Sequence, residues 1–329
     1  MKTLKDYGEV SLIHFIKDFF KNELGGTSFL PYGDDAFGVD VGEYKKIIVN
    51  SDMFVNAVDN PPNLDLFCGG WKLVTMNVSD IIAKGATPIS FILSIAAPPE
   101  LSFAQFIRFL SGIRSALQYY NIKLIGGDLN EGPDLIADGT VIGIAKNNVH
   151  TRFDAKAGDI LATTGEFGDT ALGLKLLLNK MQIEDREFEY FRQKVCKPVA
   201  PVSKGLFLSL LDFVTSVIDS SDGLVRSLYE LSRCSNVGFE ITNIPISSQV
   251  KTFSKKYDID PIPLALFGGE EYELIFTVKP QKWDILLHEA EQRNLKLYPL
   301  GRVIPEKKIL LKTDKDTIEL DENGWTYFR

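Results

Sequence analysis

The chain has 329 residues, of which 45% are hydrophobic and 24% are charged, as is usual for a soluble globular protein of one or two domains. Its formal net charge is −8, and no block of Lys or Arg compensates locally, which argues against a surface for nucleic acid or anionic membranes. Apolar runs fall short of the roughly 18 residues of a membrane span, and the N-terminus lacks a signal-peptide pattern, so we expect a cytoplasmic protein.

The three cysteines, Cys68, Cys196 and Cys234, are far apart in the sequence and odd in number. Such spacing supports neither a disulfide framework nor a CxxC zinc site. We therefore expect free thiols in a reducing compartment.

The first half of the chain alternates helical and extended patterns. Apolar residues at helical spacing predict a core helix over residues 10–24 and further helices over 71–84 and 103–120. β-Branched and apolar runs predict strands at residues 47–49, 89–96, 122–125 and 140–145. Polar groups follow two of these strands, where α/β proteins bind ligands. They are Asn50, Ser51 and Asp52 after the first strand, and Gly126, Gly127 and Asp128 after the third.

A polar stretch over residues 147–158 indicates a domain boundary, which predicts domains at 1–148 and 149–329. Beyond it, a glycine loop at residues 165–168 leads into a helix and is typical of an anion-binding helix N-terminus. The other elements predicted in this half are strands at 160–164, 214–218 and 272–278, a turn at 219–223 and a helix at 224–233.

Several catalytic signatures are missing from the sequence. There is no GxxxxGK[ST] loop, GxGxxG fingerprint, HExxH helix or GxSxG elbow. The only histidines are His14, His150 and His288, and they form no cluster with cysteines. Zinc chemistry and histidine-based nucleophilic catalysis are both disfavoured.

What remains is a set of carboxylates and hydroxyls in turns and at strand ends. Oxygen ligands suit Mg²⁺, which bridges carboxylates to the phosphates of a nucleotide. An Asp beside Gly or Ser is most often a turn or cap residue, but Asp80 lies inside an apolar helix, where a carboxylate is unfavourable unless something binds it. For Glu271 and Glu273 we favour a solvated position. The candidate ligands are Asp35, Ser51, Asp52, Asp80, Asp128, Asp219, Ser221 and Asp222.

Together these motifs resemble, in order and spacing, those of the thiamine-monophosphate kinases. The resemblance covers essentially the whole chain, although some motifs are shared with the aminoimidazole-ribonucleotide synthetases and selenophosphate synthetases. The matching segments are GDDA at residues 33–36, NSDMFV at 50–55, WKLVTMNVSDIIAKGATP at 71–88, IGGD at 125–128, TGEFGDTALGL at 164–174, IDSSDGL at 218–224 and FGGEEYELIFTV at 267–278.

The resemblance implies a two-domain α/β (α+β) fold like that of aminoimidazole-ribonucleotide synthetase. An N-terminal mixed sheet would form the interface of a homodimer, and an α+β domain would follow. The implied reaction is the ATP-dependent phosphorylation of thiamine monophosphate to thiamine diphosphate, with several Mg²⁺ ions.

The resemblance also implies residue roles. The positions implied for Mg²⁺ are Asp35, Asn50, Ser51, Asp52, Asp80, Asp128, Asp219 and Asp222, of which Asp52, Asp219 and Asp222 are expected to be catalytic. Those implied for ATP are Gly127, Asp128, Arg152 and Ser221. Those implied for thiamine monophosphate are Asp59, Glu270 and Trp325.

Some positions depart from the family pattern. Residues 129–132 replace the TTRG that often follows the GGD motif, Lys197 replaces the usual Arg before Pro198, and Glu271 replaces the Asp of GGEDYEL. Two alternatives stay open: another ATP-dependent enzyme of the superfamily, such as one like selenophosphate synthetase, and a non-catalytic nucleotide-binding scaffold.

Overall fold

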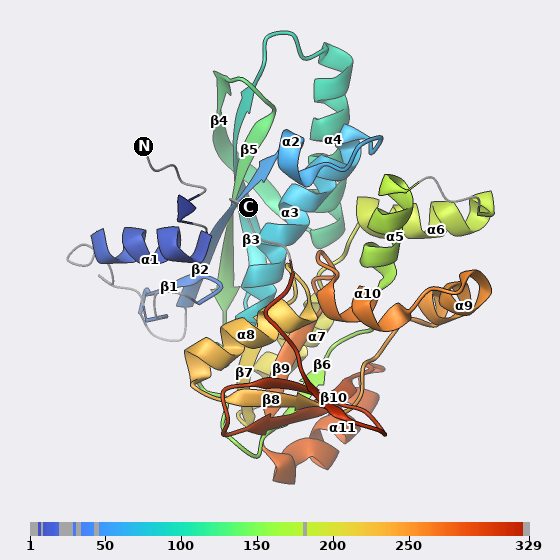
Figure 1. Cartoon of the computed structure of the whole chain (residues 1–329). Helices are drawn as coiled ribbons and strands as arrows, with labels where there is room; N and C mark the ends of the chain where they lie inside the picture. The colour runs from blue at the N-terminus through green and yellow to red at the C-terminus, as the bar shows by residue number, and fades with distance from the viewer. Residues whose placement is uncertain are drawn as a thin grey trace.

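The computed structural model describes residues 6–7, 9–19, 29–30, 34–42, 46–179 and 183–324. Each half of the chain forms its own mixed β-sheet, and helix α3 (Leu66–Ala83) lies where the two halves meet (Figure 1). This architecture is the two-sheet α/β arrangement that the resemblance implied. Among the described residues, no helix combines the length and apolarity that a membrane span requires.

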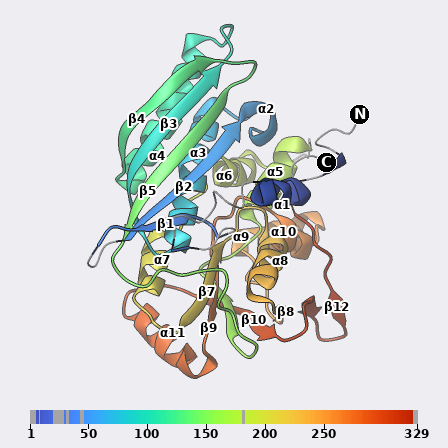
Figure 2. The ribbon, with the colours of Figure 1, turned by 90° about the vertical axis from the view of Figure 1, so that its left-hand side faces the viewer.

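The N-terminal sheet has five strands in the order β1-β2-β5-β3-β4. Its neighbours are antiparallel except β3 and β4, which are parallel because helix α4 (Phe103–Tyr120) crosses between them. Helices α3 and α4 cover one face, and the strands lie in front of them in Figure 2. The strands are β1 (Phe37–Asp40), β2 (Lys46–Val55), β3 (Thr87–Ala97), β4 (Lys123–Glu131) and β5 (Ile136–Ala145), and the short helix α2 (Asn56–Asp59) follows β2.

Helices α3 and α4 pack with their backbones almost in contact. A Cβ on Gly70 would lie 2.1 Å from the carbonyl oxygen of Phe109, and one on Gly112 would lie 1.9 Å from that of Phe67. Only glycine permits this approach. Helix α3 begins at Leu66 because the carboxylate of Asp65 accepts a hydrogen bond from the Phe67 N–H at 2.7 Å.

The second sheet has seven strands in the order β12-β11-β8-β10-β6-β9-β7, all antiparallel neighbours except β11 and β8. Its strands are β6 (Ile160–Thr163), β7 (Val214–Asp219), β8 (Gly238–Ile241), β9 (Leu274–Val278), β10 (Tyr298–Ile304), β11 (Ile309–Lys312) and β12 (Thr317–Glu319). The helices of this half are α5 (Asp169–Leu178), α6 (Asp185–Cys196), α7 (Val202–Ser209), α8 (Leu224–Ser235), α9 (Ser248–Tyr257), α10 (Pro261–Phe267) and α11 (Trp283–Glu291), the last preceded by a 3₁₀ turn at Pro280–Lys282.

Helix α3 joins the two halves through its buried side chains. The indole N–H of Trp71 donates to the carbonyl of Pro198 at 2.7 Å, and the hydroxyl of Thr75 donates to the same carbonyl at 3.2 Å. The main apolar core continues from α3 into α7, β7 and β9, so no solvent layer separates the halves there. Polar residues on this helix can therefore reach both sheets.

Several strand predictions were too short, and two of them involve candidate site residues. Strand β2 runs to Val55, so Asn50, Ser51 and Asp52 lie inside the strand and not beyond its end. Strand β4 continues through Gly127 and Asp128 to Glu131, with a register shift opposite Phe91 and Ile92. A β-bulge admits the glycines and keeps the strand paired with β3. Helix α6 was not predicted, because most of its residues are polar.

The helix predicted over residues 10–24 was expected to be buried in the core, and this expectation was wrong. Helix α1 (Glu9–Phe19) is described, and residues 20–28 lie outside the described part. The side chains of Phe15 and Phe19 are 63% and 70% exposed, so this helix is not core material.

The expectation of three unpaired cysteines was also wrong. Cys68, in the first turn of α3, forms a disulfide with Cys196, the last residue of α6. The two residues are 128 positions apart in sequence, so their spacing could not indicate the pair. Cys234 is free.

Candidate active site

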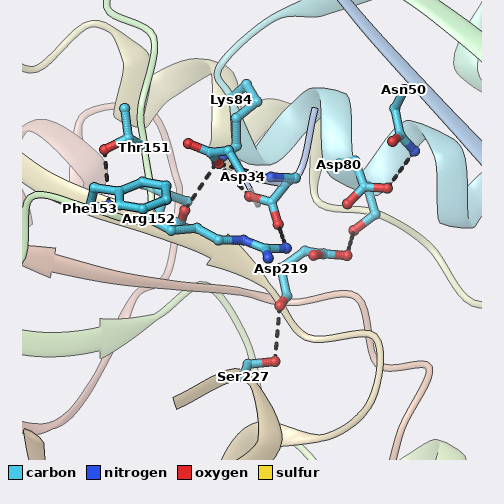
Figure 3. A network of polar contacts seen from close by, with 12 residues as sticks. Asp34, Asn50, Asp80, Lys84, Thr151, Arg152, Phe153, Asp219 and Ser227 are labelled. Carbon is cyan, nitrogen blue, oxygen red and sulfur yellow. Dashed lines mark hydrogen bonds and ion pairs between the residues drawn. The ribbon is translucent and has the colours of Figure 1, made fainter. Parts of the chain in front are cut away.

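Three carboxylates meet where α3 faces the second sheet. Oxygens of Asp35, Asp80 and Asp219 all lie within 4.8 Å of one another. They come from the turn before β1, from the last turns of α3 and from the end of β7 (Figure 3). Only the tertiary fold brings these three segments together.

Neighbouring polar groups fix two of these acids in place. The amide of Asn50 donates to Asp80 at 2.6 Å, and the hydroxyl of Ser79 donates to Asp219 at 2.6 Å. The backbone N–H of Asp52 donates to the side-chain oxygen of Asn77 at 3.0 Å. Because Asn50 and Asp52 are two residues apart in a strand, both side chains point toward α3.

Two cations balance the third acid. Nζ of Lys84 lies 2.5 Å from Oδ2 of Asp35 and also pairs with Asp34, while the guanidinium of Arg152 pairs with Oδ1 of Asp35. Lys84 and both aspartate side chains are fully buried. Such a charge is stable in a protein interior only when it is paired.

The pKa shifts separate Asp35 from the other acids. Burial alone would raise the pKa of Asp35, but Arg152 and Lys84 outweigh it and lower this pKa. Burial raises the pKa of Asp80 well above its usual value, and the charges of Asp219 and Asp52 add to the shift. Burial and then the charge of Asp35 raise the pKa of Asp219 to about 7.

This donor set fits a divalent cation. Burial disfavours the charged form of a carboxylate, and crowded carboxylates also repel one another, so both effects favour the protonated forms of Asp80 and Asp219 when no metal is bound. A hard cation such as Mg²⁺ would replace those protons and compensate the charge. Asp52 has the same character, because burial raises its pKa as well.

Other residues implied as metal or ATP ligands lie apart from this cluster. Ser51 points to the opposite face of β2, where its hydroxyl donates to Asp138 at 3.0 Å. Asp128 is exposed on the edge strand β4. Beside it, a Cβ on Gly127 would lie 1.7 Å from the carbonyl oxygen of Leu93, so this position requires glycine. The structure does not bring Ser51 or Asp128 to the three acids.

The turn after β7 holds Ser221, which is exposed, and Asp222, which is half-buried. Gly324 lies against this turn, since a Cβ on it would be 2.6 Å from the carbonyl oxygen of Asp222. Trp325, the next residue, lies outside the described part of the chain.

A lysine that the sequence analysis did not select joins Asp59 and Glu270. Nζ of Lys72, on α3, lies 2.7 Å from Oε1 of Glu270 and donates to the backbone carbonyl of Asp59 at 3.1 Å. The seven-residue spacing of Lys72 and Ser79 on one helix was the available signal, because side chains near multiples of 3.6 residues share a face.

The expectation that Glu271 and Glu273 are solvated was wrong. The carboxylate of Glu271 accepts N–H groups of Gly168 and Thr170 at 2.7 and 3.2 Å, at the start of α5. Glu273 accepts the hydroxyl of Thr164 at 2.6 Å. Burial raises the pKa of Glu271 to about 8. The helix N-terminus expected to bind an anion is thus occupied by a carboxylate of this chain.

Comparison with known proteins identifies relatives of this chain. The model of the family "AIR synthase related protein, N-terminal domain" matches residues 33–145. The thiamine-monophosphate kinase of Pyrococcus abyssi is 35% identical over 95% of this chain and 93% of its own length, and that of Aquifex aeolicus is 29% identical over 99% of each.

A solved structure described as "AaThiL complexed with AMPPCP and TMP" superposes with a TM-score of 0.86 at 27% identity, covering 99% of both chains. The agreement extends over both sheets and α3 between them. Sequence and fold agree over nearly the full length, and the chain belongs to the thiamine-monophosphate kinase family.

Proposed function

We propose that this protein transfers the terminal phosphoryl group of ATP to the phosphate of thiamine monophosphate, giving ADP and thiamine diphosphate. The observation that carries the proposal is the meeting of Asp35, Asp80 and Asp219 in a chain of this family. The similar structure described with AMPPCP and TMP, which we take to be an ATP analogue and thiamine monophosphate, supports the choice of both substrates.

We propose that the acid cluster holds Mg²⁺. Its members are Asp35, Asn50, Asp52, Asp80 and Asp219, with Asp222 in the adjoining turn. Ser51 and Asp128, which do not reach this cluster, are proposed as Mg²⁺ ligands apart from it. When bound, Mg²⁺ supplies the positive charge that lets two anionic phosphates approach each other. Asp52, Asp219 and Asp222 are the proposed catalytic acids.

The proposed roles of the remaining residues are binding and orientation. Arg152, whose side chain is 17% exposed beside Asp35, supplies a fixed positive charge to the nucleotide. Gly127, which has no side chain, lets the backbone of β4 approach the nucleotide closely. Asp128 and Ser221 are the other proposed ATP contacts.

A phosphate acceptor is already ionised, so in-line transfer requires no strong base, and orientation dominates the rate. Asp59, Glu270 and Trp325 are the proposed contacts of thiamine monophosphate. Negative charge and an aromatic face suit its cationic ring.

Three further proposals concern the whole molecule. We propose a homodimer, supported by the exposed apolar side chains of Leu124, Ile125 and Leu129 on the edge strand β4. We propose domains at 1–148 and 149–329, supported by the two separate sheets. A cytoplasmic location is proposed because ATP is the co-substrate. The Cys68–Cys196 disulfide opposes this location, and thiol counting on protein purified without oxygen tests it.

The experiment that tests the function uses the purified chain with Mg²⁺, ATP and thiamine monophosphate. Thiamine phosphates are separated chromatographically, with and without EDTA. We expect thiamine diphosphate and ADP in equal amounts, and neither with EDTA. ATP bound without thiamine diphosphate formed would overturn the proposal and direct the search to other phosphate acceptors.

A further inference from the structure

Lys72 is a buried lysine on α3, where the two halves of the chain meet. Its side chain is 1% exposed, although lysines are among the residues least often buried. Desolvating an ammonium is unfavourable unless partners compensate it, and both partners of Lys72 are described above. Its ion pair with Glu270 and its hydrogen bond to the Asp59 carbonyl measure 2.7 and 3.1 Å.

These two partners come from opposite halves. Asp59 ends helix α2, directly after β2, and its carboxylate accepts the Val55 N–H at 2.7 Å, so its backbone is fixed. Glu270 lies in the turn before β9, in the second half of the chain. Lys72 therefore sets the distance between two residues that the proposed function assigns to one substrate.

The segment that carries Glu270 is strained. Glu270 and Tyr272 have φ angles of 63° and 54°, in the left-handed region that residues other than glycine rarely adopt. Backbone hydrogen bonds from their N–H groups to Ser221 and Ser220, at 2.6 and 2.9 Å, hold the segment to the turn after β7. Strain of this kind persists only where the surroundings enforce it.

The side chain of Glu270 stays 30% exposed while it is paired with Lys72. The ion pair thus fixes the carboxylate in one place without covering it. Without Lys72, the Glu270 carboxylate would lose the ion pair that fixes its position.

We propose that Lys72 is a positioning residue for thiamine monophosphate, acting through Glu270. The inference rests on the proposed function. It predicts that removing Lys72 weakens the binding of thiamine monophosphate, whereas the loss of a positive charge alone would strengthen it. Removing a positive charge beside Glu270 would, by electrostatics alone, strengthen the binding of a cationic ring. Loss of a fixed position would weaken it.

The test is Lys72→Met, which preserves the length of the buried side chain and leaves Glu270 able to be solvated. We expect the KM for thiamine monophosphate to rise at least 10-fold, with kcat and the KM for ATP changed less than 3-fold. Calorimetric titration of thiamine monophosphate without ATP should show the same weakening. Lys256→Met, which removes an exposed ion-paired lysine of α9, is the matched control.

A double-mutant cycle tests whether Lys72 affects the KM for thiamine monophosphate through Glu270. Because Lys72 acts through Glu270, adding Lys72→Met to Glu270→Gln should change the KM less than 3-fold further. If Lys72→Met fails to fold, Lys72→Gln, whose amide can still donate to the Asp59 carbonyl, carries the same expectation.

The outcomes are distinct. An unchanged or lower KM in a folded, active Lys72 variant would overturn the positioning role and leave the kinase activity standing. Additive effects in the cycle would also overturn it. Absence of thiamine diphosphate from the wild-type reaction would instead reject the proposed function.

Discussion

At the scale of single residues, the site consists of acids that are held together before any cation arrives. The negative charge of Asp35 is compensated by Lys84 and Arg152. Asp80 and Asp219 instead have raised pKa values, which favour their protonated, uncharged forms. From the raised pKa values we predict how stability depends on pH and how a substitution of Asp80 changes stability and activity.

The raised pKa of Asp219 predicts a pH-dependent stability of the metal-free protein. Its pKa is about 7 in the folded chain against an ordinary 3.8, so between these values the folded state binds more protons than the unfolded state. Stability from this group is therefore fully present below the ordinary pKa and is lost as the pH rises through 7. In EDTA, the melting temperature should fall between pH 5 and 8.

Comparison with Asp219→Asn measures the contribution of the Asp219 carboxyl group, because an asparagine side chain does not titrate. The melting temperature of the variant should depend less on pH in that window, and Mg²⁺ should stabilise the wild type more at pH 8 than at pH 5. Equal slopes for wild type and variant, measured by scanning fluorimetry, would contradict the assignment. Asp314→Asn, in the exposed turn between β11 and β12, is the control.

Asp80→Asn should separate activity from folding. The change removes a buried group whose ionisation is opposed by burial and by the charges of Asp219 and Asp52, so the metal-free protein should melt at the same or a higher temperature. Turnover should fall roughly 1,000-fold, because a Mg²⁺ site of this kind supplies several kcal/mol of transition-state stabilisation. Near-normal kcat, or a large loss of stability, would contradict the role of this acid.

At the scale of elements, α3 organises the site. Along one side it carries Cys68, Lys72 and Ser79, which contact α6, Glu270 and Asp219 respectively. Lys84, directly after its last residue, pairs with Asp34 and Asp35. Its contact with α4 through Gly70 and Gly112 fixes it to the N-terminal sheet. Each contact on this helix therefore affects how the two halves meet.

The Cys68–Cys196 disulfide predicts that reduction destabilises the protein. A cross-link between residues 128 positions apart restricts the unfolded chain, which corresponds to at most about 5 kcal/mol in the chain-entropy model. Urea unfolding of Cys68→Ser, compared with wild type under oxidising and reducing conditions, measures this contribution. Wild type should match the variant only when it is reduced.

Cys234→Ser is the control for that experiment, since Cys234 is free. It should unfold like the wild type under oxidising conditions, and thiol titration of the native wild type should find one thiol. Wild-type protein with three titratable thiols and unchanged stability would show that the disulfide does not form in solution.

At the scale of the whole molecule, the N-terminal sheet leaves an edge open. Leu124 and Leu129 on β4 are 54% and 65% exposed, and β4 has a strand partner on one side only within its sheet. Exposed apolar side chains along a free strand edge are typical of an interface. This observation supports the proposed homodimer.

The charged variant Leu129→Asp should therefore be monomeric at concentrations at which the wild type is a dimer, as measured by light scattering after gel filtration. Ile318→Asp, on the edge strand β12 of the second sheet, is the matched control and should not change the mass. A monomeric wild type would refute the dimer, and a dimeric Leu129→Asp would place its interface elsewhere.

The sequence by itself determined the features that depend on local order. Helix α4 has the predicted bounds, 103–120, because its apolar spacing and its Ser102 cap are local signals. Family membership likewise follows from short motifs in a fixed order. The carboxylate-rich character of the site was also present in the sequence.

Only the tertiary structure decided which of those groups meet. Asp35, Asp80 and Asp219 converge, whereas Ser51 turns to the other face of β2, because one residue along a strand reverses the side chain. The Lys72–Glu270 pair and the Cys68–Cys196 disulfide join segments distant in sequence. Hydrophobic periodicity specifies which face of an element is buried, but the partner across that face is chosen by packing of the whole chain.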